Sequence, residues 1–151
     1  MKILIDGDSC KRKDTIVEVA KKQNIPVHIY CDVKHILDDD YAEIHVVDYG
    51  ANNTDIAIAN HTNKNDIVIT NDISLAAIIL AKHGMALNNY GQIFTNKNID
   101  SFITHKHILK TAQRKSKRLS LHTNMNQNIK HPSFYHSLHQ VINKAKKNRT
   151  K

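Results

Sequence analysis

The chain has 151 residues, of which 40% are hydrophobic and 24% are charged, with four glycines and two prolines. This composition excludes collagen-like and wholly disordered chains, and a chain of this length buries roughly 70% of its unfolded surface without needing disulfide or metal staples. Lys and Arg number 22 against 14 Asp and Glu, which gives a formal net charge of +8.

Short apolar runs alternate with helix-like segments over residues 1–87. We expect strands at residues 2–5, 26–31, 44–47 and 67–70, and a short last strand at 85–87, because these are short apolar runs, the second of them rich in β-branched and aromatic residues. We expect helices over residues 14–24, capped by Asp14 or Thr15, over 52–59, and over 73–82 with Gly84 as the stop. This alternation predicts an α/β fold with a mostly parallel sheet and helices on both faces.

The predicted core is made of apolar residues from these strands and from the third helix. Its members are Ile3, Ile5, Val27, Ile29, Val46, Ile67, Ile69, Leu75, Ile78 and Ile79.

The remainder of the chain differs in charge. We expect an α/β domain over residues 1–110 and a basic, helical C-terminal extension over 111–151, partly mobile, with helices at 99–109 and 133–147. Residues 1–100 hold ten basic and all fourteen acidic residues, a net charge of −4, whereas residues 101–151 hold twelve basic residues and no acid, a net charge of +12. Such a one-signed region predicts a nucleic-acid partner; the alternative is a solvated tail that keeps the protein soluble.

Four acidic residues are expected at the carboxyl ends of the strands. Asp6 and Asp8 follow the first strand, Asp72 follows the fourth, and Asp55 opens the helix after the third. In an open parallel sheet, ligands bind at this edge. Clustered carboxylates repel one another unless a cation lies among them, and their oxygen atoms suit Mg²⁺ or Mn²⁺. The pattern predicts a metal site of the kind that cleaves phosphodiester bonds, with these four residues as catalytic and metal-binding candidates.

Three of the four acids also have an ordinary structural explanation. Asp55 and Asp72 can cap the helices that follow them, and Asp8 can be a turn residue beside Gly7. The metal site is favoured because all four acids fall on the same predicted edge.

Other residues are candidates for supporting roles. Thr70 and Asn71 are expected either to orient a water or phosphate or to be ordinary strand-end residues. The basic residues expected to contact nucleic acid are Lys11, Arg12, Lys13, Arg114, Lys115, Lys117 and Arg118.

Several motifs in residues 1–110 occur together in a known family. They are residues 6–10 (DGDSC), Gly50 followed by Thr54-Asp55, residues 66–76 (DIVITNDISLA), and residues 87–95 (LNNYGQIFT) followed by Asn98-Ile99. As a set they resemble the YaiI/YqxD family of uncharacterised bacterial proteins, which is related to PIN-like nuclease domains. Lys11 stands where that family usually has Pro, Tyr90 where it has Arg, and residues 131–134 replace a Gly-Pro and Asp-Arg segment. The resemblance implies a PIN-like fold and retains the four acids.

The residues and the resemblance together predict a divalent-metal-dependent nuclease that uses Mg²⁺ or Mn²⁺, with RNA as the expected substrate. One alternative is a non-catalytic nucleic-acid-binding protein on the same scaffold. Another is a haloacid-dehalogenase-type phosphatase, because residues 3–8 (ILIDGD) resemble the opening motif of that family, with Asp6 as nucleophile and Asp8 as acid/base.

Location and redox state follow from composition. The chain has no run of about 18 apolar residues, so no membrane-spanning helix is expected. The first acid, Asp6, follows only three apolar residues, which is too short a run for a secretory signal. We therefore expect a cytoplasmic protein in which Cys10 and Cys31 are reduced.

Overall fold

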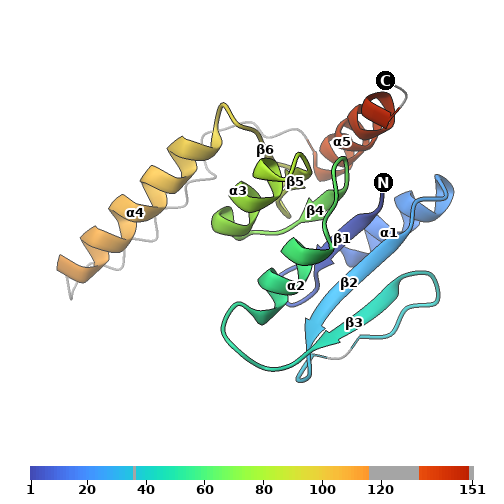
Figure 1. The fold of residues 1–151 in the computed structure, drawn as a ribbon, viewed down its shortest axis with the longest axis horizontal. Coiled ribbons are helices and arrows are strands. Elements are labelled where there is room, and N and C mark those ends of the chain that lie inside the picture. Colours follow the sequence, from blue (N-terminus) through green and yellow to red (C-terminus); the bar gives the residue numbers. More distant parts are fainter. Residues whose placement is uncertain (36, 116–132, 150–151) are drawn as a thin grey trace.

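The computed structural model describes residues 1–35, 37–115 and 133–149 (Figure 1). The elements follow in the order β1 (Ile3–Asp6), α1 (Lys13–Lys22), β2 (Val27–Asp32), β3 (Glu43–Val47), α2 (Asn53–His61), β4 (Ile67–Ile69), α3 (Ile73–Ala81), β5 (Met85–Leu87), β6 (Ile93–Phe94), α4 (Ile99–Lys115) and α5 (Phe134–Arg149). None of the described helices is both long enough and apolar enough to cross a membrane.

The described strands form one sheet in the order β3-β2-β1-β4-β5-β6. Strands β1 to β5 are parallel to their neighbours, and β6 pairs antiparallel with β5. This confirms the predicted α/β fold with a mostly parallel sheet. The chain extends from β1 to β2 and β3 on one side and continues through β4 and β5 on the other. The gap between β1 and β4 is therefore the topological switch point, where ligands bind in open α/β sheets.

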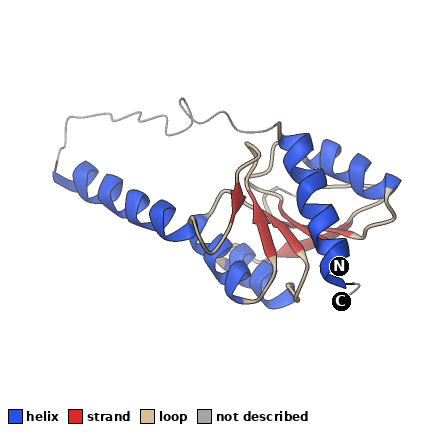
Figure 2. Ribbon diagram, turned by 90° about the horizontal axis from the view of Figure 1, so that it is seen from above, coloured by secondary structure: helices blue, strands red, loops and turns tan. Residues whose placement is uncertain are grey.

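The period-two pattern of the strands explains why helices cover both faces (Figure 2). Ile3 and Ile5 in β1 share one cluster of buried residues with α1 and α5. Leu4, between them, shares the second cluster with residues of α2, α3 and α4. The buried residues that α5 adds to the first cluster are Phe134, Leu138, Val141, Ile142 and Ala145.

Two predicted core residues are exposed. Val46 is 49% exposed because it lies on β3, the edge strand, where the described helices leave it uncovered. Ile78 is 48% exposed because α3 buries Leu75, Ala76 and Ile79 toward the sheet and turns Ile78 away from it. The other predicted core residues are buried.

Some element ends differ from the predictions. Helix α1 begins at Lys13 with Arg12 at its N-cap, so Asp14 lies inside the first turn and neither it nor Thr15 is the cap. The left-handed residue after α3 is His83, with φ 60°, rather than Gly84. Gly84 is needed for a different reason: a Cβ there would lie 2.8 Å from Ile79 Cγ2. The strand at 85–87 is not the last one, because β6 follows it.

Candidate functional site

Asp6 is the last residue of β1 and is buried, with 9% of its surface exposed. Ser9 Oγ donates a hydrogen bond of 2.7 Å to Asp6 Oδ2. Burial raises the pKa of Asp6, the bond from Ser9 opposes this rise, and the charge of Asp8 adds to it. A carboxylate is thus held in a place that disfavours its charge, beside a second carboxylate.

Asp55 lies in the first turn of α2 and does not cap it, because the N-cap is Asn52. Burial raises the pKa of Asp55, and the charges of Asp72 and then Asp6 raise it further, while Lys106 lowers it. The carboxylate of Asp55 therefore lies within electrostatic range of those at the ends of β1 and β4.

Asp72 caps helix α3, which is the ordinary structural role expected for this residue as the alternative to metal binding. Its Oδ1 accepts hydrogen bonds from the backbone N–H groups of Ser74, at 2.6 Å, and Leu75, at 3.2 Å. Lys106 Nζ of α4 lies 3.7 Å from the same oxygen. Thr70 is fully buried and its Oγ1 accepts the backbone N–H of Asp72. Thr70 thus holds the backbone at Asp72, and within the described contacts Asp72 uses Oδ1 alone.

Asp8 is exposed and meets two residues that the sequence analysis did not select. His35 Nδ1 lies 2.8 Å from Asp32 Oδ1 and 3.8 Å from Asp8 Oδ1. The backbone N–H of Asp32 donates to Asp8 Oδ1 at 3.3 Å. Burial would raise the pKa of Asp32, but the hydrogen bonds from His35 and Lys34 outweigh it, and the pKa is lowered. Asp32 ends β2, so the rule that selected Asp6 could have found it.

A hollow of about 540 Å³ adjoins Asp55 and Asp72. Ile56 and Ile78 line it and are both about half exposed, and Lys106 lines it from α4. The acidic edge is therefore bordered by apolar surface and by one cation.

A second hollow, of about 270 Å³, lies among the loops that follow β1, β4 and β5. Its lining residues are Ser9, Lys11, Arg12, Asn71, Asn89 and Tyr90. Arg12 Nε donates to the carbonyl oxygen of Asn89 at 2.8 Å, and its guanidinium lies 5.3 Å from the centre of the Phe134 ring. Asn71 Oδ1 accepts the backbone N–H of Asn89. Lys11 and Arg12 thus line a hollow next to the acids.

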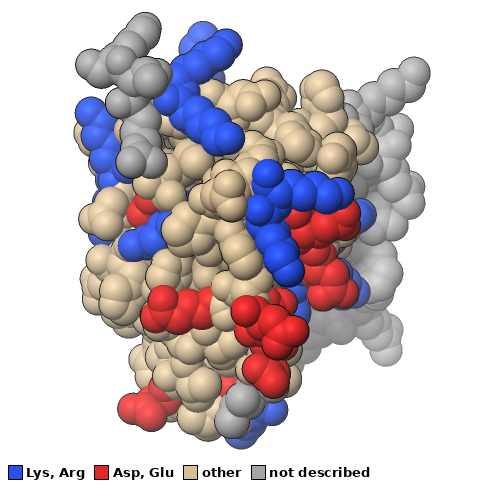
Figure 3. Space-filling view, turned by 90° about the vertical axis from the view of Figure 1, so that its right-hand side faces the viewer, with Lys and Arg blue, Asp and Glu red and all other residues tan. Residues whose placement is uncertain are grey.

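The remaining basic candidates lie elsewhere. Lys13 Nζ donates to the carbonyl oxygens of Gly7 and Cys10, so it fixes the loop after β1. Arg114 is exposed near the end of α4. Lys115 is the last residue of α4, and Lys117 and Arg118 lie outside the described residues. On the face shown in Figure 3, acidic side chains gather mostly in the lower half and basic ones mostly in the upper half.

Two sets of three metal-ligating side chains have ligand atoms within 4.8 Å of one another in the described part of the chain. They are Asp8, Asp32 and His35, and His28, Glu43 and His45. Asp6, Asp55 and Asp72 are in neither set, so they lie within electrostatic range without being gathered to coordination distance. Cys10 and Cys31 are free and buried.

Comparisons with known proteins agree with the resemblance in the motifs. Residues 4–144 match the family described as "Uncharacterized BCR, YaiI/YqxD family". A UPF0178 protein of Alkaliphilus oremlandii is 45% identical over 118 residues, covering 78% of this chain and 76% of that protein. One of Clostridium perfringens is 42% identical over 114 residues, 76% of each chain. One of Clostridium tetani is 37% identical over 148 residues, covering 97% of this chain and 100% of that protein. No solved structure matches the chain.

Proposed function

The chain belongs to the uncharacterised YaiI/YqxD family, and we propose that it is a divalent-metal-dependent nuclease that cleaves RNA. The observation that carries this proposal is that Asp55 and Asp72 line one hollow together with Lys106. Burial and the charges of Asp72 and Asp6 raise the pKa of Asp55 there. Repulsion of this kind destabilises the fold unless a cation offsets it. Asp6 and Asp72 stand at the carboxyl ends of β1 and β4, the switch point at which a ligand is expected in such a sheet.

The chemistry of the donor set fits Mg²⁺ or Mn²⁺, because Asp6, Asp8, Asp55 and Asp72 offer only carboxylate oxygens. Asp72 can contribute Oδ2 while Oδ1 keeps the cap of α3. Bound among these residues, such an ion supplies a water of lowered pKa and offsets charge on the phosphate.

The other residues around the acids would hold the substrate. Lys106 faces Asp72 and carries the charge that a phosphate oxygen attracts. Lys11 and Arg12 line the neighbouring hollow, where they would hold a flanking phosphate. Ile56 and Ile78 present apolar side chains beside Asp55, on which a nucleobase can lie.

One observation favours a second candidate, a nucleic-acid-binding protein without catalysis. Asp72 Oδ1 already accepts two backbone N–H groups and faces Lys106. If that arrangement persists in solution with metal present, Asp72 is a structural residue, and the basic residues alone define the function.

The full-length protein with Mn²⁺ and 5′-labelled single-stranded RNA, alongside DNA of the same sequence, separates these candidates. We expect RNA cleavage that EDTA abolishes and that Asp55→Asn reduces to the level seen with EDTA. The matched control is Asp14→Asn, which removes an exposed carboxylate from α1 and should cleave like the wild type. RNA binding without cleavage would overturn the nuclease and support the binding protein. Transfer of phosphate to Asp6 from a small phosphoester would support the phosphatase instead.

A further inference from the structure

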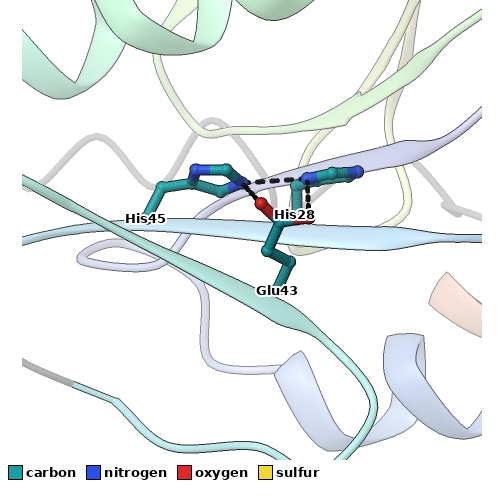
Figure 4. A group of neighbouring side chains, drawn as sticks. All are labelled: His28, Glu43 and His45. Carbon is teal, nitrogen blue, oxygen red and sulfur yellow. Dashed lines mark hydrogen bonds and ion pairs between the residues drawn. The ribbon is translucent and has the colours of Figure 1, made fainter.

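A cluster of two imidazoles and one carboxylate lies on the edge of the sheet, away from the acids described above. Figure 4 shows that His28 and His45 point toward each other with the carboxylate of Glu43 between them. His28 Nδ1 lies 2.9 Å from His45 Nε2. Glu43 Oε1 lies 3.3 Å from His45 Nε2, and Glu43 Oε2 lies 3.5 Å from His28 Nδ1.

The register of β2 and β3 creates this cluster. His28 is the partner of Glu43, and Tyr30 is the partner of His45, in the parallel pairing of these strands. Because side chains alternate between faces, residues 28 and 30 of β2 share a face with residues 43 and 45 of β3. A slip of one residue between the strands would place His28 on one face of the sheet and Glu43 and His45 on the other.

Neighbouring rings hold the histidines in place. His45 stacks on Tyr30 at 4.6 Å between ring centres and an angle of 9°. His61, at the end of α2, also stacks with these rings. Its ring centre lies 5.7 Å from that of Tyr30 and 6.0 Å from that of His45. Burial raises the pKa of Tyr30 to about 12, and the charge of Glu43 adds to this. The phenol therefore stays protonated and supports the cluster by packing.

Protons alone leave the three groups poorly matched. With one N–H shared between the two facing ring nitrogens, that N–H can point either to the other nitrogen or to the carboxylate. Whichever it chooses, one of the short contacts places a nitrogen lone pair against an acceptor. Protonating both rings would bring two positive charges together at 2.9 Å.

We propose that His28, Glu43 and His45 form a binding site for a divalent transition-metal ion of the Zn²⁺ class, separate from the acidic edge. Two imidazoles and one carboxylate suit Zn²⁺ and its chemical relatives better than Mg²⁺. Zn–N bonds of about 2.0–2.1 Å in tetrahedral geometry set the nitrogens roughly 3.3 Å apart, so the rings need to separate by only a few tenths of an ångström.

The site leaves open positions and lies apart from the acids. The side chain of Glu43 is 65% exposed, whereas those of His28 and His45 are 19% and 28% exposed. The imidazoles are therefore held and partly shielded, Glu43 can swing onto the ion, and solvent can fill the fourth position. Tyr30 of β2 is the register partner of both Asp6 and His45, so the backbones of these two residues lie two strand spacings, about 10 Å, apart. The two sites share no ligand and can be tested separately.

Titration of the full-length protein with Zn²⁺ by calorimetry, and with Co²⁺ by visible absorption, tests this site. We expect one Zn²⁺ bound more tightly than the rest, and Co²⁺ bands typical of nitrogen ligation. Glu43→Gln and His45→Gln should each weaken this site by more than about tenfold, since even the loss of a residue behind a metal ligand costs that much.

The matched control for Glu43→Gln is Glu18→Gln, because the Glu18 side chain is 66% exposed and lies on α1. Glu18→Gln should bind Zn²⁺ like the wild type, and Asp6→Asn should keep the tight site even where weaker binding at the acidic edge is lost. Should His45→Gln misfold by circular dichroism, the exposed Glu43→Gln decides the matter. The proposal is overturned if the wild type shows no such tight site, or if Glu43→Gln keeps the affinity of the wild type.

Discussion

Lys106 Nζ lies 3.7 Å from Asp72 Oδ1, so α4 brings a positive charge to the carboxyl end of β4. The same lysine lowers the pKa of Asp55 against the effects of burial, Asp72 and Asp6. An ammonium group thus partly offsets the repulsion among the acids, and a divalent cation at this edge has to compete with it.

Replacing Lys106 by Gln should therefore tighten Mn²⁺ binding in the absence of nucleic acid. Two unit charges at this distance interact by about 1 kcal/mol in water, and an exposed pair realises less, so we expect an increase in affinity of about two- to fivefold. Calorimetric titration with Mn²⁺ measures it, with Lys110→Gln on the same helix as control. Equal affinities in Lys106→Gln and the wild type would mean that Mn²⁺ does not bind beside Asp72.

The pH dependence of stability should reveal the strain at Asp55. Its pKa in the folded state is raised above the ordinary value of 3.8, so between these two values the folded protein holds the proton that the unfolded chain has lost. The wild type consequently loses stability as the pH rises through this window. Asp55→Asn lacks this loss and should gain stability relative to the wild type as the pH rises. Urea unfolding in EDTA from pH 3 to 7 tests this, and a difference that does not change with pH would contradict it.

Ile69 should be among the most costly residues to truncate. It is fully buried in β4 and shares the cluster formed by β1, α1 and α5. Ile69→Ala should lower the free energy of unfolding by about 2–5 kcal/mol, through lost burial plus a cavity. Ile78→Ala, at a half-exposed position of α3, should cost clearly less. Chemical denaturation of both variants gives the comparison, and similar losses would place Ile69 outside the core.

The basic third of the chain should bind nucleic acid through phosphates. The affinity for single-stranded RNA should then fall with salt by a log–log slope of about −0.7 for each phosphate neutralised. Replacing Arg114, Lys115, Lys117 and Arg118 together by Gln should flatten that slope and weaken binding to all sequences alike. Lys21→Gln/Lys22→Gln, in the last turn of α1, is the control. An unchanged slope in the fourfold variant would leave this segment as a solubility tail.

The fold was largely predictable because its strands carry their own signals. Residues 3–5 and 67–69 are short, wholly apolar runs, and the alternation of such runs with helices indicated the parallel sheet. Strand β6 was missed because it has only two residues, and its pairing depends on the turn between Asn88 and Gln92. The exposure of Val46 and Ile78 was missed because hydrophobicity alone does not say which side of an edge strand or helix is covered.

The candidate site was predictable only where a strand end coincided with an acid. Asp6 and Asp72 follow neighbouring strands, so topology brings them to one edge. Lys106 reaches that edge through the tertiary position of α4, which no local pattern records. His28 and His45 meet only through the register of β2 and β3, and their separation along the chain carries no metal-binding spacing.

Mn²⁺-dependent stabilisation tests the central claim, a metal site among the four acids, most directly. An ion that binds only the folded state adds about 2.7 kcal/mol at one hundred times its dissociation constant. Wild-type protein should gain stability on this scale as Mn²⁺ is raised. Asp6→Asn/Asp72→Asn should gain little stability from Mn²⁺. This variant should still fold, because Asn is as good an N-cap residue as Asp and therefore keeps the cap of α3. The same Mn²⁺-induced rise in melting temperature in both proteins would contradict the claim.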